Sequence, residues 1–138
     1  MNAESPGPWR GTGAEFWSDL DAAFASRCER YRMTSEPVDE ELRQLVLEQI
    51  TEQLRALIHA VPHGDEIATR AAAHVLKGIG GTVGLPEISA VGECLSEAAR
   101  AGDWPRCRAF YERLASWLAL NRGEGSFGCS SGGAYTRT

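Results

Sequence analysis

Apolar side chains recur every three or four positions along most of this chain, the spacing that predicts amphipathic helices. Proline and glycine mark the ends of the periodic segments, because proline fits the first turn of a helix and glycine fits the residue after its last turn. The predicted helices span about residues 14–32, 38–61, 66–82, 86–101 and 105–121. No alternating pattern typical of a strand is present, so an all-α chain is expected.

Each predicted helix presents one apolar face, and these faces are expected to form a common core. The face of residues 38–61 is assigned Leu42, Leu45, Val46, Ile50, Leu54, Leu57 and Ile58. The face of residues 14–32 is assigned Phe16, Leu20, Ala23 and Phe24. The tryptophans are also expected to pack in the core or at hinges, namely Trp9, Trp17, Trp104 and Trp117.

Short connections between the last four predicted helices imply that neighbours run antiparallel. The sequence therefore predicts an antiparallel up-and-down four-helix bundle over about residues 38–121, with residues 14–32 as an additional N-terminal helix. One helical domain is expected over residues 14–122. Residues 1–13 are interpreted as a flexible leader, and the glycine- and serine-rich residues 123–138 as a disordered tail.

Composition excludes several classes of protein. The chain has 138 residues, enough for one hydrophobic core, and its net charge of −5 argues against nucleic acid as the main partner. No apolar run approaches the roughly 20 residues that span a membrane, and the N-terminus has no apolar signal segment, so a cytoplasmic location is expected. The cysteines Cys28, Cys94, Cys107 and Cys129 are widely spaced, which predicts unpaired thiols and no zinc site.

His74 is predicted to lie on the side of the helix over residues 66–82 that faces away from its apolar stripe. At about 100° per residue, that stripe consists of Ala72, Leu76, Ile79 and Val83. The neighbours of His74 one or two turns away are Ala71, Gly78 and Gly81, which leave the surface around the imidazole bare. Because glycine inside a helix costs about 1 kcal/mol relative to alanine, this pattern indicates a surface that a partner approaches closely.

The motif His74-x-x-Lys77-Gly78 is followed by Gly84-Leu85 and by the alanine-containing run 97–103. This arrangement resembles the histidine-containing phosphotransfer (HPt) domain of multistep two-component relays, over about half of the chain. The resemblance implies that His74 carries a phosphoryl group between aspartates of two receiver domains, as a covalent carrier rather than a turnover enzyme. It also implies that the receiver supplies Mg²⁺, so no cofactor or metal of the chain itself is expected.

Further residues around His74 are assigned roles. Lys77, on the flank of His74, is expected to stabilise the phosphoryl group by its positive charge. The docking surface for receivers is assigned Ile67, Arg70, Ala71, Gly78 and Gly81, with Ser89, Glu93 and Ser96 of the next helix along its other edge. His59 and His63 lack such surroundings and are interpreted as cap or surface residues.

A second interpretation is a helical adaptor or regulator that binds a receiver domain or a sensor kinase through the same surface without being phosphorylated. A small enzyme that uses His74 as a general base is disfavoured, since no second titratable group stands at a fixed helical spacing from it. A monomer is expected in the carrier interpretation, because the chain would dock through one exposed face.

Overall fold

The computed structural model describes residues 9–10, 13–31 and 38–122. Its elements are the short 3-10 helix η1 (Ala14–Phe16), α1 (Phe24–Arg30), α2 (Glu40–Ala60), the short 3-10 helix η2 (Val61–His63), α3 (Glu66–Val83), α4 (Pro86–Arg100) and α5 (Trp104–Asn121). Within these residues there is no strand, which confirms the all-α prediction.

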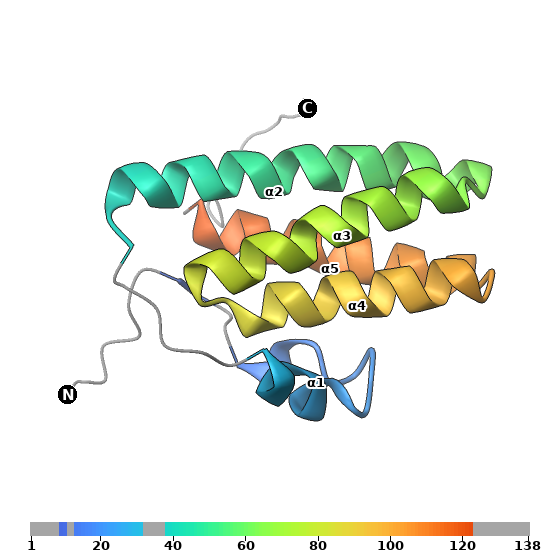
Figure 1. Cartoon of the computed structure of the whole chain (residues 1–138), viewed down its shortest axis with the longest axis horizontal. Coiled ribbons are helices and arrows are strands. Elements are labelled where there is room, and N and C mark those ends of the chain that lie inside the picture. The colour runs from blue at the N-terminus through green and yellow to red at the C-terminus, as the bar shows by residue number, and fades with distance from the viewer. Residues whose placement is uncertain (1–8, 11–12, 32–37, 123–138) are drawn as a thin grey trace.

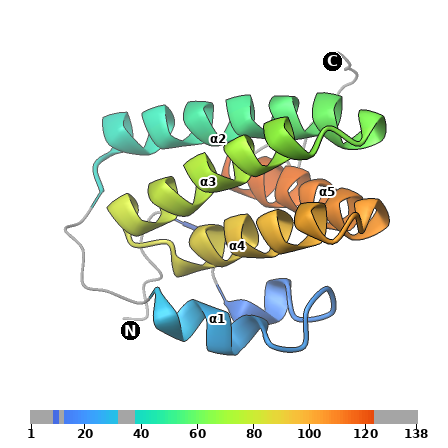
Figure 2. The ribbon, with the colours of Figure 1, turned by 45° about the vertical axis from the view of Figure 1, so that its right-hand side comes forward.

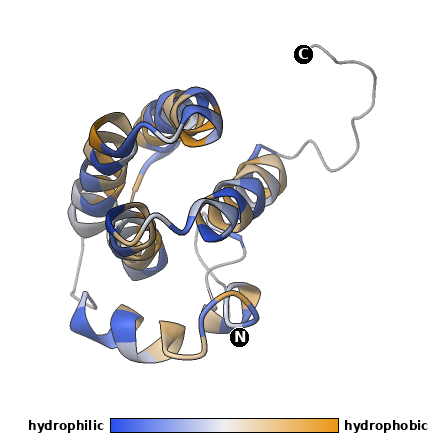
Figure 3. Ribbon diagram, turned by 90° about the vertical axis from the view of Figure 1, so that its right-hand side faces the viewer, coloured by the Kyte–Doolittle hydropathy of each residue, from blue (hydrophilic) through white to orange (hydrophobic). Residues whose placement is uncertain are grey.

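The four long helices α2 to α5 lie side by side, and consecutive helices run in opposite directions (Figures 1 and 2). Viewed end-on, they surround a common interior, and the N-terminal segment with η1 and α1 lies outside them, next to α4 (Figure 3). The largest fully buried side chains are Trp17, Trp117, Phe24, Phe110, Leu47, Ile50, Leu57, Leu76, Leu85, Ile88, Leu95 and Leu114. The core is therefore formed by every long helix and by the N-terminal segment.

Aspartates define where three of the long helices begin. The carboxylates of Asp39, Asp65 and Asp103 each accept a hydrogen bond from the backbone amide three residues on, at 2.8, 3.0 and 3.3 Å. Such a cap satisfies one of the amides that the first turn leaves without a partner. Gly84 ends α3 with a φ of 71°, a left-handed conformation that favours glycine. Asp65 and Gly84 thus mark the two ends of α3.

The prediction of one continuous helix over residues 14–32 is wrong. The segment forms η1, a turn that includes Asp21, and then α1. In a continuous helix, Trp17 and Phe24 would lie about 10 Å apart along the axis. The turn instead brings their rings to a centroid distance of 5.7 Å, and both side chains are fully buried. Burial of two stacked aromatic rings therefore outweighs the helical pattern.

The predicted apolar face of α2 is wrong at three positions. Leu42, Leu45 and Ile58 are 41%, 55% and 47% exposed, whereas Leu47 is buried at 1%. The reason is that α2 packs against α3 and α5 and has no other long helix over its remaining surface. Its buried stripe is thus narrower than the apolar pattern, and the outer leucines remain at the surface.

Part of the predicted leader packs onto α5. The rings of Trp9 and Trp117 are stacked at 5.8 Å, and the backbone amide of Arg10 donates to Asn121 Oδ1 at 2.7 Å. Trp9 is 6% exposed, which agrees with the packing role predicted for it. The leader residues 1–8 and 11–12 and the predicted disordered tail over residues 123–138 lie outside the described residues.

The backbones of α3 and α4 approach each other so closely that two positions admit only glycine. A Cβ atom on Gly92 would lie 2.4 Å from the carbonyl oxygen of Ala73 and 2.9 Å from the amide nitrogen of Lys77. A Cβ atom on Gly80 would lie 2.5 Å from the amide nitrogen of Ser89. The Ser89 hydroxyl donates to the Lys77 carbonyl at 2.7 Å across the same contact. This contact fixes the part of α3 that carries His74.

We predict that Gly92→Ala lowers the free energy of unfolding by about 1–3 kcal/mol. The added methyl group would overlap backbone atoms of α3, which can move away only if the helix shifts. Gly78→Ala is the matched control. A Cβ atom there meets nothing within 4 Å, so this substitution should raise the free energy of unfolding by up to about 1 kcal/mol. Urea denaturation measures both, and a Gly92→Ala protein as stable as the wild type would contradict the prediction.

Candidate functional site

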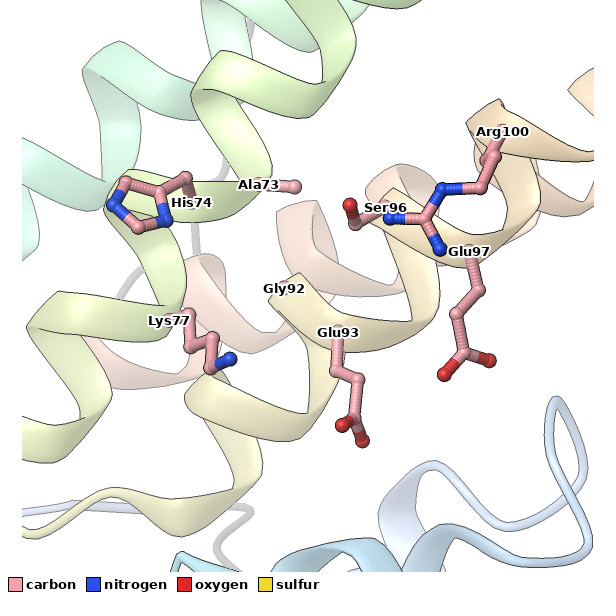
Figure 4. A pocket seen from close by; sticks show the side chains of 8 residues that line it. All are labelled: Ala73, His74, Lys77, Gly92, Glu93, Ser96, Glu97 and Arg100. Atoms are coloured by element: carbon pink, nitrogen blue, oxygen red, sulfur yellow. The ribbon is translucent and has the colours of Figure 1, made fainter.

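His74 is exposed on α3, two positions before the fully buried Leu76. Its imidazole stands out from the helix in Figure 4, while Ala73 beside it is 1% exposed and faces α4. The orientation follows from the helical period, since the buried stripe of α3 turns His74 toward solvent. The exposure predicted for His74 is therefore observed.

A groove of about 240 Å³ lies between His74 and α4. Its lining residues are Ala73, His74, Lys77, Gly92, Glu93, Ser96, Glu97 and Arg100 (Figure 4). The floor is low because Gly92 carries no side chain where α4 meets α3. The rim carries charges of both signs, so the groove is suited to a small anionic group only if the carboxylates are compensated.

Lys77 is the only lysine in the chain, and it lies on the α3 side of this groove. Its ammonium group points toward α4 in Figure 4 and lies 5.7 Å from the centroid of the Tyr31 ring, a cation–π contact. No carboxylate of the described residues forms an ion pair with it. The charge of Lys77 therefore stays beside His74 on a flexible side chain without being bound to an acidic group.

The carboxylates on the opposite rim are held by the N-terminal segment. Arg27 of α1 donates to Glu93 at 2.9 Å and to Glu97 at 2.9 Å, and its Nε donates to Asp21 at 2.5 Å. These three acceptors together raise the pKa of the Arg27 guanidinium, the hydrogen bond to Glu97 most of all. Arg27 is thus a permanent positive charge shared by three carboxylates.

Glu93 receives two further hydrogen bonds from the same segment. Arg30 donates to its Oε1 at 2.5 Å and the Tyr31 hydroxyl donates to its Oε2 at 2.9 Å. Burial of Glu93 acts to raise the pKa of its carboxyl group, but the hydrogen bonds from Arg27, Arg30 and Tyr31 outweigh burial and leave that pKa lowered. Glu93 therefore remains ionised next to the groove, with both carboxylate oxygens hydrogen-bonded.

Four of the five docking residues assigned from the sequence line one of two hollows on α3, and His74 lines one of these hollows. Ile67, Arg70, Ala71 and His74 line one of them together with Ser96. Gly78 lies instead on an apolar groove between α2 and α3, which also includes Leu42, Leu45 and Ile79. Gly81 lines neither hollow and is half-buried. Ile67 is 84% exposed, as expected for a residue on the His74 side of α3.

The sequence prediction is wrong for Ser89, one of the residues assigned to the α4 edge of the docking surface. Ser89 is completely buried, because it lies in the α3–α4 contact, whereas Glu93 and Ser96 do line the groove. Gly92 and Arg27 were missed. Gly92 could have been found, since Ser89, Gly92 and Ser96 form a row of small residues along one face of the helix. The role of Arg27 could not have been predicted, because the spacing of residues along the chain does not reveal which segment packs over Glu93.

The other two histidines lie at the turn between α2 and α3. His59 and His63 are both exposed, and His63 Nδ1 lies 2.9 Å from the His59 carbonyl oxygen. Neither residue lines the groove described above. They match the prediction of surface residues and offer controls for any substitution of His74.

The three cysteines of the described residues are buried. Cys94 and Cys107 are buried outside any disulfide, and burial raises the pKa of the Cys107 thiol to about 11, so that it stays protonated. Cys28 is also buried, and Cys129 lies outside the described residues.

Among the described residues, no three His, Cys, Asp or Glu side chains are grouped as metal ligands would be. No helix in this part of the chain is sufficiently long and apolar to span a membrane.

Comparison with known proteins gives one match. The family model described as Hpt domain matches residues 41–122, which run from the first turn of α2 to the end of α5. Searches of curated proteins and of solved structures give no match.

We predict that acid weakens the attachment of the N-terminal segment to α4. The pKa values of Asp21 and Glu93 are lowered in the folded chain, so their stabilisation is complete above the ordinary carboxyl values of 3.8 and 4.5. It is lost as the pH falls through the lowered values, because both groups then become protonated.

The measurement is the free energy of unfolding between pH 7 and pH 3. Glu93→Gln should lower it by about 1–3 kcal/mol at pH 7, as expected for lost hydrogen bonds to a charged group. The difference from the wild type should shrink toward pH 3. Parallel curves for the two proteins over this range would rule out the assignment.

Proposed function

We propose a phosphoryl-carrier function from the premise that this chain belongs to the Hpt domain family, whose model matches α2 through α5. Membership places the chain in two-component phosphotransfer. The finer proposal is that His74 carries the phosphoryl group between receiver aspartates in a multistep phosphorelay. The observation that supports it is the exposed imidazole of His74 in a groove that also holds the single lysine of the chain.

The proposed step needs only a nucleophile from this chain. A nitrogen of the neutral imidazole of His74 attacks the phosphorus of an aspartyl phosphate in a receiver domain. The bond between phosphorus and the aspartate oxygen breaks, and its electron pair leaves with the aspartate carboxylate. The reverse step transfers the group to a second receiver. We propose that the receiver provides Mg²⁺ and that the chain is a covalent carrier with no cofactor of its own.

Two glycines support docking of a macromolecule beside His74. A Cβ atom on Gly78 or on Gly81 would meet nothing within 4 Å, so packing within the chain does not require glycine at either position. Each glycine nevertheless costs the helix about 1 kcal/mol relative to alanine. We infer that the bare surface serves the approach of a receiver, with Ile67, Arg70 and Ala71 as further contact residues.

The fold and the setting complete the proposal. The arrangement of α2 to α5 supports an antiparallel up-and-down four-helix bundle with α1 as an additional N-terminal helix. Docking through one exposed face suits a monomer, and receiver domains as partners suit a cytoplasmic chain. Nucleic acid and membrane are not among the proposed partners.

We predict that His74→Gln abolishes labelling by a panel of phosphorylated receiver domains, because glutamine offers no nucleophilic nitrogen. His63→Gln is the matched control and should be labelled like the wild type, since His63 lies outside the groove. The label should be labile to acid and stable to base. Labelling of His74→Gln would refute the proposal. A wild-type chain that binds a receiver without being labelled would instead indicate a phosphorylation-independent adaptor.

We predict that Lys77→Ala lowers the fraction of His74 that is phosphorylated at equilibrium by about threefold to tenfold, the size expected for one partly exposed charge pair. Lys77→Arg should retain most of that fraction, because it keeps the charge. The measurement uses phosphoramidate as the phosphoryl donor, so that the measured fraction does not depend on docking of a receiver. Equal phosphorylated fractions in the wild type and in Lys77→Ala would show that Lys77 does not stabilise the phosphoryl group.

A further inference from the structure

We propose that Arg27 and Arg30 of the N-terminal segment are positioning residues for phosphotransfer, which hold Glu93 and Glu97 so that Lys77 stays available to the phosphoryl group. This inference rests on the proposed function of His74. It adds an element outside the matched residues 41–122, since α1 precedes that region.

The groove beside His74 has no excess of positive charge of its own. Lys77 and Arg100 contribute two positive charges to its lining, and Glu93 and Glu97 contribute two negative charges. A phosphoryl group on His74 would bring further negative charge to the same space. Repulsion by the two carboxylates would then act against phosphorylation unless other groups compensate them.

The N-terminal segment supplies that compensation. Arg27 is paired with Glu93 and Glu97 at 2.9 Å, and Arg30 is paired with Glu93 at 2.5 Å. Figure 4 shows both carboxylates directed away from α3, toward the N-terminal segment. The side chain of Arg27 is only 15% exposed, so its charge is less screened by solvent than that of a surface arginine. With the two arginines in place, Lys77 and Arg100 dominate the groove.

The same pairing decides which partner Lys77 can have. Lys77 and Glu93 line one groove from opposite sides, which would suit an ion pair between them. Both oxygens of Glu93 are already occupied, Oε1 by Arg27 and Arg30 and Oε2 by the Tyr31 hydroxyl. The amine of Lys77 lies over the Tyr31 ring instead. A cation–π contact at a partly exposed site is weak, and a phosphoryl group carries close to two negative charges, so the amine can leave the ring for the phosphoryl group.

The experiment compares two variants that both break the ion pairs of Arg27 and Arg30 with Glu93 and Glu97. Arg27→Gln/Arg30→Gln removes the arginines and leaves the carboxylates, whereas Glu93→Gln/Glu97→Gln removes the carboxylates and leaves the arginines. Each full-length chain is equilibrated with phosphoramidate and ammonia. In this exchange the P–N bond of phosphoramidate breaks, a P–N bond to the imidazole forms and ammonia leaves. The measured quantity is the phosphorylated fraction of His74.

The arginine variant should reduce the equilibrium constant for phosphorylation about tenfold, as two uncompensated carboxylates close to the site would. The glutamate variant should equal or exceed the wild type, and the combined fourfold variant should return to the wild-type value within about twofold. In a Lys77→Ala background, the effect of the arginine substitutions should become smaller. Because the chain has one lysine, ¹³C-labelled lysine gives a single side-chain NMR signal, which should shift only in the arginine variant.

The outcomes separate this inference from the proposed function. Equal losses of phosphorylation in the arginine and glutamate variants would show that the ion pairs act only by attaching α1, and would overturn the inference. An arginine variant that is phosphorylated like the wild type would also overturn it. In both cases labelled His74 would leave the carrier function standing. A wild-type chain that takes no label from phosphoramidate or from receivers would refute the carrier function itself.

Discussion

The close approach of α3 and α4 is the constraint on which the site depends. At Gly80 and Gly92 the backbones meet without an intervening Cβ atom, and the hydroxyl of Ser89 bonds to the carbonyl of Lys77 at their contact. The contact sets the rotation of α3, which turns His74 to the surface. It also sets the depth of the groove, because Gly92 forms its floor. Packing and chemistry therefore share the same few residues.

The electrostatics of the site involve one more helix than the α3–α4 contact does. The nucleophile and the single lysine come from α3, the carboxylates come from α4, and the arginines that compensate them come from α1. Asp21, Glu93 and Glu97 are matched by Arg27, Arg30 and Arg106, which form one network between the N-terminal segment and the long helices. Since this network consists of partly exposed pairs, it responds to salt and acid more readily than the apolar core does.

The helical pattern could predict most of the fold and the exposure of His74, because both follow from the period of one helix at a time. It failed at the N-terminal segment, where stacking of Trp17 on Phe24 decides the path of the chain. It failed again on α2, where Leu42 and Leu45 are apolar but have no helix over them. Such outcomes depend on which elements become neighbours, and neither helical spacing nor composition contains that information.

The candidate site likewise has residues that the sequence could predict and residues that it could not. Lys77 and Gly78 could be related to His74 because they lie within four residues of it along one helix. Ser89 was assigned to the docking edge, although the contact between two helices buries it completely. Arg27 reaches the groove from 66 residues away in the sequence through its pair with Glu93. Long-range pairs of this kind become visible only in three dimensions.

The single lysine has a practical consequence for how this chain can be handled. Reagents that acylate amines can react with this chain at its α-amino group and at one side chain, Lys77 in the rim of the groove. A support coupled through the Lys77 amine would face His74 and cover the surface around it. A chain immobilised through Lys77 would show no binding of a large partner that docks around His74, and the cause would be the orientation of the molecule and not its affinity.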